Sequence, residues 1–413
     1  LILAGQFIFF RRIICSLTVI FIQFLHTYSG EYYPDTSYLK VIFAGDIMGH
    51  DAQIQAAYNP VTKEYDYEST FRHVKPYIEK ADIAIGNLEV TLAGPPYKGY
   101  PRFSSPDNLA VKAGIAGFDI LVTANNHALD KGKSGFIRTL NVLDSLNIIH
   151  TGTFRDKKDR DLNYPLIFEK NNIRVALLNY TYGTNSLKAD TPCIVNRIDT
   201  MLIEQDLIKA RSADPDYIFV TMHWGTEYER YANEVQQNLA KFMLNKGADA
   251  IIGSHPHVVQ PVDIYYPDAS DSSDFTVIVY SLGNFVSNQR EQYRDGGIIF
   301  ELTLLKTSSG TGIFDYRYLP TWVYKEENKG DFTFYITPVK LYYENEDFFD
   351  FSDHDKYKIN RFYKDTRGLL KNIPESEFYD TIINNILTRA VGKLVPEDLK
   401  FTLRRFLPEY ISH

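Results

Sequence analysis

The sequence contains little cysteine. Its 413 residues include 2 cysteines, Cys15 and Cys193, and Cys15 falls in an N-terminal segment that we expect to be a targeting signal. Removal of that segment would leave Cys193 alone, so the mature chain cannot form an intrachain disulfide. A structural zinc site closed by several thiolates is excluded for the same reason.

Excess positive charge is also absent. The chain has 44 Lys and Arg against 52 Asp and Glu, which gives a net charge of −8. No basic stripe with interleaved aromatic residues occurs along the sequence. We therefore expect no nucleic-acid partner.

The apolar run at the N-terminus, Ile13 to Leu25, is short for a membrane-spanning helix. Arg11 and Arg12 precede it, and polar residues follow it up to Gly30. This order is typical of a secretory signal peptide, and the alternative for residues 1–30 is an uncleaved anchor. Both interpretations predict an exported protein, either periplasmic or anchored to the outer side of the cytoplasmic membrane.

Short apolar runs alternate with segments of helical spacing from Leu39 to Tyr280. This alternation predicts a mixed α/β fold with largely parallel strands. The predicted strands are 39–44, 83–85, 118–123, 166–168, 174–178, 217–222, 248–252 and 276–280, with a hairpin turn at Asn171-Asn172. The predicted helices are 69–80 with Ser69 as N-cap, one capped by Asp107, one that begins at Ser134, 200–213 and 234–246. After Gly297 the pattern predicts strands, such as 298–304 and 332–336, and beyond about Asp350 it predicts helices, with segments near 373–394 and 396–407.

Polar turns with metal-ligating side chains follow five of these strands. In α/β sheets, ligands collect at the carboxyl ends of the strands. The nitrogen and oxygen donors suit Zn, Mn or Fe, and their number exceeds what one tetrahedral ion needs, so we expect two divalent transition-metal ions. The predicted ligands are Asp46, Glu89, Asn126, His223, His255 and His257.

His127 stands beside this predicted metal site. Two metal ions would clamp a phosphoryl oxygen and lower the pKa of a bound water, so hydrolysis of a phosphate ester would follow. His127 would protonate the leaving group, and Asp130 would hold the His127 ring in one tautomer. The alternative for Asp130 is a carboxylate at a turn or at the start of a helix.

Four further residues are candidates for substrate binding. Arg102, in a Gly- and Pro-rich loop, would pair with an anionic group, or would be a solvated loop arginine. Trp224 and Tyr228 would line a pocket, or would pack against the sheet. Asn284 would contact the ligand, or would be a turn residue.

Six motifs in one order resemble the CapA family, which is associated with poly-gamma-glutamate capsule synthesis and belongs to the calcineurin-like metallophosphatase superfamily. The resemblance extends from about Leu39 to Leu305. It implies two β-sheets packed as a sandwich and flanked by helices in residues 31–308, with a binuclear site at the strand ends, and it leaves 309–413 as a C-terminal extension of strands and then helices. The motifs are Gly-Asp-x-Met at 45–48, Gly-Asn-Leu-Glu at 86–89, Asn-Asn-His-x-x-Asp-x-Gly at 125–132, His-Trp-Gly-x-Glu-Tyr at 223–228, Gly-Ser-His-Pro-His-Val-x-Gln-Pro at 253–261 and Ser-Leu-Gly-Asn-Phe at 281–285.

The resemblance also implies roles for single residues. Asp46 matches the first aspartate ligand, and Asn126 with His127 matches the pair of ligand and general acid. His223 matches the lone histidine ligand, and the pair His255 and His257 matches the last two.

The sequence departs from the superfamily pattern at two positions. Met48 stands where the superfamily has histidine, and His50 is the candidate substitute. Asn87 stands where it has a bridging aspartate, so Asn87 remains a candidate ligand and Glu89 is the candidate source of the carboxylate.

Two functions remain open. The first is an envelope hydrolase of the phosphoesterase type, which acts on a phosphoester or on an anionic capsule polymer such as poly-gamma-glutamate. The second is a non-catalytic capsule-assembly component that binds polymer and keeps a degenerate metal site. Membrane-bound capsule synthesis components are the expected partners of either.

Overall fold

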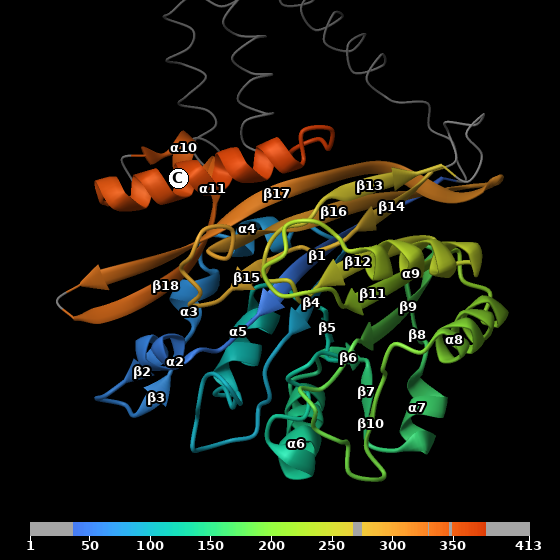
Figure 1. Cartoon of the computed structure of the whole chain (residues 1–413), viewed down its shortest axis with the longest axis horizontal. Coiled ribbons are helices and arrows are strands. Elements are labelled where there is room, and N and C mark those ends of the chain that lie inside the picture. Colours follow the sequence, from blue (N-terminus) through green and yellow to red (C-terminus); the bar gives the residue numbers. More distant parts are fainter. Residues whose placement is uncertain (1–35, 267–274, 329, 347–348, 377–413) are drawn as a thin grey trace, which may run out of the picture.

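The computed structural model describes residues 36–266, 275–328, 330–346 and 349–376. Two β-sheets lie face to face and helices cover their outer faces, as Figure 1 shows. The predicted two-sheet α/β fold is therefore confirmed. The predicted leader and the predicted helix at 396–407 lie outside the described residues, as does most of the segment 373–394.

The first sheet has eight strands, in the order β18-β17-β16-β1-β4-β5-β6, and β15 also pairs with β1. Its centre is parallel, because β1 pairs with β4 and β4 with β5 in that sense, whereas β16, β17 and β18 are antiparallel. The strands are β1 Ser37–Ile47, β4 Ile83–Leu88, β5 Ile120–Val122, β6 Ile149–Thr151, β15 Asn284–Val286, β16 Gly296–Thr307, β17 Gly310–Asn328 and β18 Asp331–Pro338.

The second sheet has six strands, in the order β13-β14-β12-β11-β9-β8, with parallel strands at its centre and an antiparallel strand at each edge. The hairpin between β8 and β9 is confirmed, since Asn171 and Asn172 both have positive φ, 52° and 60°, which suits a tight two-residue turn. The strands are β8 Leu166–Lys170, β9 Ile173–Thr181, β11 Tyr217–His223, β12 Ala250–Ser254, β13 Val262–Tyr265 and β14 Thr276–Val279.

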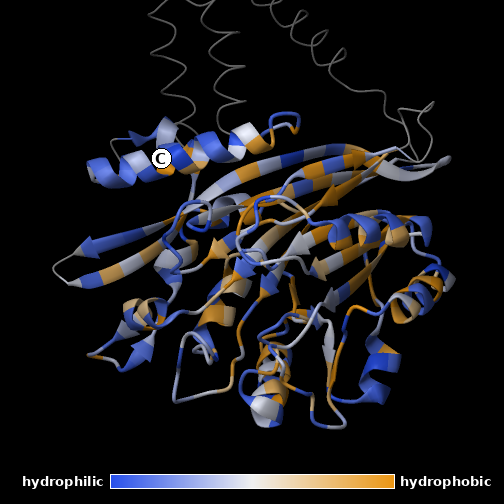
Figure 2. Cartoon of the chain, viewed as in Figure 1, coloured by the Kyte–Doolittle hydropathy of each residue, from blue (hydrophilic) through white to orange (hydrophobic). Residues whose placement is uncertain are grey.

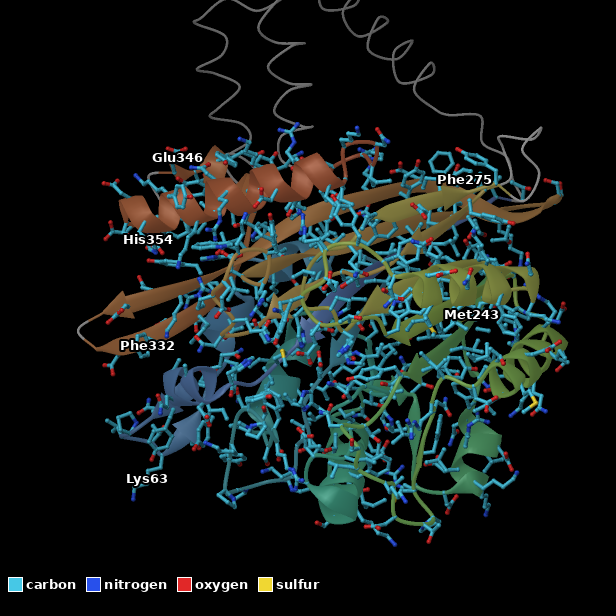
Figure 3. The ribbon with its side chains drawn as sticks, viewed as in Figure 1. Lys63, Met243, Phe275, Phe332, Glu346 and His354 are labelled. Atoms are coloured by element: carbon cyan, nitrogen blue, oxygen red, sulfur yellow. The ribbon has the colours of Figure 1, made fainter. Side chains whose placement is uncertain are left out.

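Alternating residues of the central strands pack on opposite faces. In β1, Val41 and Phe43 point into the space between the sheets, where the Phe43 and Phe219 rings meet at 5.1 Å. Ile42 and Ala44 face the other way, toward the helices that cover the first sheet. Figure 2 shows the hydrophobic residues gathered along these central strands, and Figure 3 shows side chains filling the space between the layers.

Helices cover both outer faces. The core outside the first sheet receives side chains from α3 Glu68–Phe71, α4 Lys75–Ile78, α5 Asn108–Ile115 and α6 Gly132–Ser145. The second sheet is covered by α8 Thr200–Ser212 and α9 Glu234–Asn245. The other helices are α2 Asp51–Ala57, α7 Lys157–Asn163, α10 Val339–Glu344 and α11 Asp353–Leu369, and two small strand pairs are β2 Tyr58–Asn59 with β3 Glu64–Tyr65 and β7 Thr153–Phe154 with β10 Ile194–Val195.

Two details of the predicted helices were wrong. The helix expected over 69–80 is divided into α3 and α4, and Ser69 lies inside α3 rather than at its cap. Pro76 explains the division, because proline has no amide hydrogen and is accommodated in the first turn of a helix. Asp107 is the N-cap residue of α5, as predicted, but its side chain makes no capping hydrogen bond. Its two oxygens accept hydrogen bonds from the Arg138 guanidinium at 2.6 and 2.8 Å.

The region after residue 308 continues the first sheet. β17 pairs along its length with β16, and β18 pairs with β17. α10 and α11 pack on β17 through a separate apolar cluster that contains Trp322, Tyr342 and Phe362. Within the described ranges, no helix has both the length and the hydropathy that crossing a lipid bilayer requires.

Candidate metal centre

The carboxyl ends of four strands from both sheets meet at one buried place. Asp46 lies near the end of β1, and Glu89 directly follows β4. His223 ends β11, whereas His255 and His257 lie in the turn after β12. These five side chains are between 0% and 2% exposed. The structure thus brings together residues that lie up to about two hundred positions apart in the sequence.

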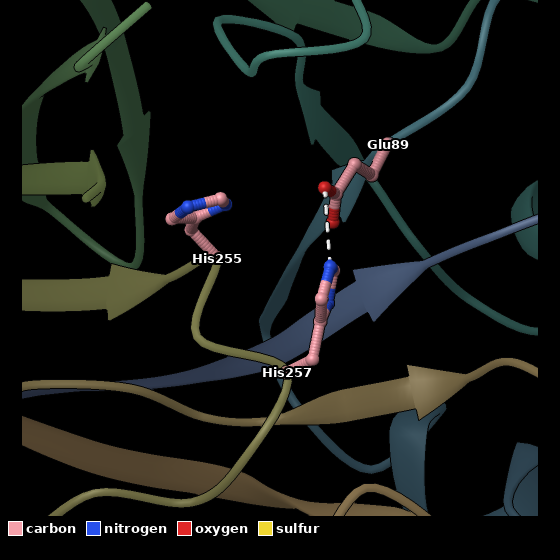
Figure 4. Close-up of side chains that lie close together, drawn as sticks. All are labelled: Glu89, His255 and His257. Atoms are coloured by element: carbon pink, nitrogen blue, oxygen red, sulfur yellow. Dashed lines mark ion pairs between the residues drawn. The ribbon is translucent and has the colours of Figure 1, made fainter. Parts of the chain in front are cut away.

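The five side chains form two sets that share one member. Glu89, His255 and His257 make the first set, and Asp46, Glu89 and His223 make the second. In each set, the possible ligand atoms lie within 4.8 Å of one another. Figure 4 shows His257 and Glu89 pointing toward each other, with 3.9 Å between His257 Nε2 and Glu89 Oε1. Glu89 Oε1 is also 3.4 Å from His223 Nε2.

Glu89 carries the clearest evidence that a cation belongs here. Both of its carboxylate oxygens are buried without a hydrogen-bond partner among the described residues, and so is Nδ1 of His255. Leaving a carboxylate unpaired in a protein interior is costly unless it coordinates a metal or protonates. Burial, together with the nearby Asp46 carboxylate, accordingly raises the pKa of Glu89 well above its ordinary value. A divalent cation bound by nitrogen and oxygen ligands fits these unpartnered atoms.

The histidines are held in the form that binds metal. Burial lowers the pKa of both His223 and His255 well below the ordinary value, and the neighbouring His257 contributes to both shifts. Neutral imidazole is the state that ligates a metal ion. For Asp46, burial acts to raise the pKa, but hydrogen bonds from His257 and Asn87 outweigh it, so the pKa lies below its ordinary value.

Asn87 acts on the ligands through hydrogen bonds. Its amide nitrogen donates to Asp46 Oδ1 at 2.7 Å and lies 3.2 Å from His223 Nδ1. Its oxygen accepts a hydrogen bond from Asn125 at 3.3 Å. Asn126 Oδ1 lies 2.9 Å from His223 Nε2, as two neighbouring ligands of one ion would. Asn87 therefore positions Asp46 and His223, and the place of the shared carboxylate is taken by Glu89.

His50 does not join either set of candidate ligands, although the sequence made it a candidate substitute for the imidazole absent at Met48. Its Nδ1 accepts a hydrogen bond from the backbone of Asn288 at 3.3 Å and lies 3.1 Å from Gln53 Oε1. Burial lowers the pKa of His50 to about 4. Met48 is buried in the apolar core outside the first sheet.

The turn that carries His255 and His257 has an unusual backbone. Both histidines have positive φ, 99° and 58°, and such conformations cost on the order of 1–3 kcal/mol each for residues other than glycine. Gly253 precedes the turn, and a Cβ there would lie 2.0 Å from the carbonyl oxygen of Tyr280. The strand end can pack this closely only with glycine, which fixes the direction in which the two imidazoles leave the sheet.

His127 and Asp130 form the predicted pair. His127 Nδ1 lies 2.7 Å from Asp130 Oδ2, and both side chains are buried. The same Asp130 oxygen accepts a hydrogen bond of 2.7 Å from the backbone nitrogen of Phe103. The Phe103 ring stands edge-on to the His127 ring, with 4.6 Å between centroids. Asp130 and Phe103 together fix the orientation of His127.

The sequence of residues 40–289 matches the family described as "Bacterial capsule synthesis protein PGA_cap". This span is more than half of the 413-residue chain. The chain belongs to the PGA_cap family.

Two curated relatives are similar to this PGA_cap protein. "Capsule biosynthesis protein CapA" of Bacillus anthracis is 30% identical over 263 residues, which cover 61% of this chain and 60% of that protein. "PGA biosynthesis protein CapA" of Bacillus subtilis (strain 168) is 30% identical over 289 residues, which cover 67% of this chain and 70% of that protein. The chain thus spans less than two thirds of the Bacillus anthracis protein.

Among solved structures, the calcineurin-like phosphoesterase YfkN of Bacillus subtilis is similar, with 14% identity, a TM-score of 0.42, and coverage of 69% of this chain and 90% of that chain. A phosphatase from Mycoplasma pneumoniae gives 14% identity and a TM-score of 0.39, with coverage of 69% and 94%.

The predicted substrate-binding residues of this PGA_cap protein lie in different surroundings. Trp224 does not line an opening: it is buried in the core outside the second sheet, where its indole nitrogen donates to the carbonyl of Tyr280. Arg102 is exposed in the loop that carries Phe103. Tyr228 is 38% exposed, and its ring lies 6.1 Å from that of His257. Asn284 is buried and donates a hydrogen bond to the carbonyl of His257 at 3.3 Å.

Sequence reasoning missed three residues of this site. Tyr182 is 42% exposed, and its ring lies 4.5 Å from that of His255. Asn185 contacts Asn126 at 3.3 Å and His127 Nδ1 at 3.5 Å. Tyr182 and Asn185 follow β9, so the rule that polar turns after parallel strands form the site would have found them. Phe103 gave no such signal, because it belongs to a long loop between β4 and α5.

Proposed function

We propose that this chain is a metal-dependent hydrolase of the cell envelope that cleaves a phosphoester or related bond during synthesis or export of an anionic capsule polymer. The observation that carries this proposal is the buried Glu89 carboxylate, which has no hydrogen-bond partner in the described chain and lies among three histidines and Asp46. Family membership supports the link to capsule synthesis. Poly-gamma-glutamate is the polymer we propose, since the Bacillus subtilis relative is named for PGA biosynthesis.

The residues that would hold the metal follow from the two sets. Glu89, His255 and His257 would hold one divalent cation, and Asp46, Glu89 and His223 would hold a second, with Asn126 beside His223. Bound there, the metal supplies an activated water and polarises the bond to be cleaved. Hydrogen bonds from His257 and, to a smaller extent, from Asn87 favour the ionised form of Asp46, and burial favours the neutral forms of His223 and His255.

His127 would transfer a proton to the leaving group. Its Nδ1 is engaged by Asp130, so Nε2 is the ring nitrogen left to deliver a proton. The Asp130 carboxylate would hold the His127 ring in one tautomer, and the Phe103 amide keeps the carboxylate in place.

The proposed location is outside the cytoplasm, on the basis of the basic, apolar and polar segments that succeed each other in residues 11–30. Membrane-bound capsule synthesis components are the proposed partners.

The test combines metal analysis with activity. The protein, purified without added metal, is expected to contain transition metal in roughly stoichiometric amount by elemental analysis, and to hydrolyse bis(p-nitrophenyl) phosphate or p-nitrophenyl phosphate. His127→Ala should lower kcat by about 10²–10⁴-fold, the usual contribution of a general acid, and leave the metal content unchanged. His150→Ala is the matched control, because His150 pairs with Asp144, a residue of α6. Folded protein that binds no metal would contradict the proposal.

The non-catalytic alternative is favoured by one observation. The two positions that depart from the superfamily pattern belong to neither set of candidate ligands: Met48 packs in the core, and Asn87 presents its amide nitrogen to Asp46. Bound metal without hydrolysis across a panel of phosphoesters, together with polymer binding that survives His127→Ala, would favour this second function over the first.

A further inference from the structure

Arg294 stands at the rim of the metal centre, in the loop between β15 and β16. Its position is fixed from the inside by Asn284. The Asn284 amide nitrogen donates to the carbonyl of Arg294 at 2.8 Å and to the carbonyl of His257 at 3.3 Å. One buried side chain therefore joins the backbone of Arg294 to the backbone of a candidate metal ligand.

The guanidinium of Arg294 lies on an aromatic ring that in turn faces the metal centre. Its central carbon is 3.5 Å from the centroid of the Tyr228 ring, within the range of a cation–π contact. Tyr228 lies 6.1 Å, ring to ring, from His257, and its backbone nitrogen donates to the carbonyl of Pro256. Arg294, Tyr228 and His257 thus form a row from the surface to the ligands.

The hydrogen-bonding edge of Arg294 is available. Its side chain is 29% exposed, and its nearest carboxylate, Glu291, is 3.7 Å away and itself 65% exposed. Within the described ranges its guanidinium makes no hydrogen bond. The nearby arginines differ, because Arg230 donates to the carbonyl of Asp365 and Arg290 donates to the carbonyl of Val323.

A second pair of the same kind joins two loops at the rim of the metal centre. These rim loops are residues 224–233, between β11 and α9, and residues 287–295, between β15 and β16. Arg230 lies over the ring of Tyr293 at 4.3 Å, so each loop contributes one arginine and one tyrosine. Tyr228 and Tyr293 both have positive φ, 71° and 73°, which for a bulky residue persists only where surrounding contacts impose it. Asp365 of α11 binds both loops, through Arg230 and through Gln292 at 2.8 Å. The position of Arg294 is therefore built into the fold.

We propose that Arg294 binds an oxyanion of the substrate, a carboxylate or a phosphate, beside the group that is cleaved at the metal centre. A stacked guanidinium keeps its N–H groups in one plane, which matches the two oxygens of such an anion. The inference deepens the proposed function and rests on it, since it assigns to the substrate at least two anionic groups. It places anion recognition at Arg294 rather than at Arg102.

The test measures binding to the metal-loaded full chain by isothermal titration calorimetry. The probes are a γ-linked glutamate decamer, the same decamer with its carboxylates methylated, and inorganic tripolyphosphate. Arg294→Gln is expected to weaken binding of one anionic probe by about tenfold or more, the usual effect of losing a hydrogen bond to a charged group. The affinity of Arg294→Lys should lie between those of the unaltered protein and Arg294→Gln, since lysine keeps the charge but lacks the paired donors. The decamer or tripolyphosphate, whichever depends on Arg294, identifies the anion as carboxylate or phosphate.

Controls separate recognition from folding. Arg72→Gln removes one exposed arginine from the end of α3 and should change neither binding nor stability. Metal content and the midpoint of thermal unfolding of Arg294→Gln should equal those of the unaltered protein, and the methylated decamer should bind it no differently.

Two results would overturn the inference: equal binding of both anionic probes by the unaltered protein and Arg294→Gln, or no binding of either probe by the unaltered protein. The proposed hydrolase activity is judged separately. If phosphoester hydrolysis is absent but probe binding depends on Arg294, the anion site stands and the hydrolase proposal fails. If hydrolysis is present but binding is indifferent to Arg294, the anion site alone fails.

Discussion

Glu89 shows how a single residue can be predicted in part. The sequence placed it after a buried strand and named it as a source of carboxylate, but it also left Asn87 as a ligand. Residues 87 and 89 are two positions apart, so in a strand their side chains point to the same face of the sheet. The alternation of faces along the strand therefore cannot tell which of the two is the ligand. The pairing of β1 with β4 shifts register between Ala44 and Asp46, and with that shift Asn87 becomes the partner of Asp46. Such a shift depends on packing between strands and leaves no local signal in the sequence.

Glu89→Gln should change stability in opposite directions with and without metal. Glutamine keeps the shape of the side chain and removes the charge that is unpaired in the metal-free protein. We expect the free energy of unfolding to rise by up to about 2 kcal/mol in EDTA, because the desolvation cost of the carboxylate is relieved. With Zn²⁺ or Mn²⁺ present, the variant should unfold at a lower temperature than the unaltered protein, since a shared ligand is lost. Thermal unfolding followed by circular dichroism in both conditions measures this, and a loss of stability in EDTA would contradict the assignment.

At the scale of helices and strands, the regular elements of the core were predictable because their apolar residues repeat with the period of the element. α9 illustrates this: Leu239, Ala240 and Met243 face the second sheet, and Asn233 with Gln236 forms a capping box at its start. Short helices were less predictable, since α3 and α4 are 4 residues each and are formed by their contacts with the sheet. One of those contacts is His73, between α3 and α4, which stacks on Tyr335 of β18 at 5.1 Å.

Because of His73, the free energy of unfolding should depend on pH. Burial, with a smaller contribution from Arg72, lowers the pKa of His73 from 6.5 to about 4. Below pH 6.5 the unfolded chain binds a proton at this position that the folded chain does not bind until about pH 4. The free energy of unfolding should therefore fall as the pH drops through this window, by about 1–2 kcal/mol after allowance for the partial exposure of the ring. His73→Phe keeps the stacking and should remove that part of the difference between urea unfolding at pH 7.5 and at pH 4.5; an unchanged difference would contradict it.

For the whole molecule, the sequence indicated two sheets through a family resemblance, and the motifs fixed the end of the sheets at which the site lies. It did not indicate how residues 309–376 attach, because alternating strands carry no information about the strand with which they pair. β16 is antiparallel both to β1 and to β17, so the strands after residue 308 extend the same sheet that holds Asp46. Leu319 and Val323 of β17 belong to the core outside the first sheet, together with Ile42 of β1.

A chain that ends at residue 308 should fail to fold. It would expose the edge of β16 and remove Leu319, Trp322 and Val323, each fully buried. Burial of such side chains contributes about 1.5–3 kcal/mol apiece, which is large against the 5–15 kcal/mol by which a typical domain is stable. Soluble yield and the near-ultraviolet circular dichroism spectrum measure the effect, with a chain that ends at residue 376 as the control. A folded product of residues 31–308 with bound metal would contradict this prediction.

The contact of α11 with the rim loops means that the candidate ligands and the residues around them come from two different parts of the chain. The family match ends at residue 289, and it contains every candidate metal ligand. Arg294 and Asp365 lie beyond it, yet Arg294 contacts Tyr228, and Asp365 contacts Arg230 and Gln292, beside the same site. On the role proposed for Arg294, relatives that share the matched segment would keep the same candidate ligands and differ in the anion that they bind, because residues beyond 289 can change without any change at the ligands.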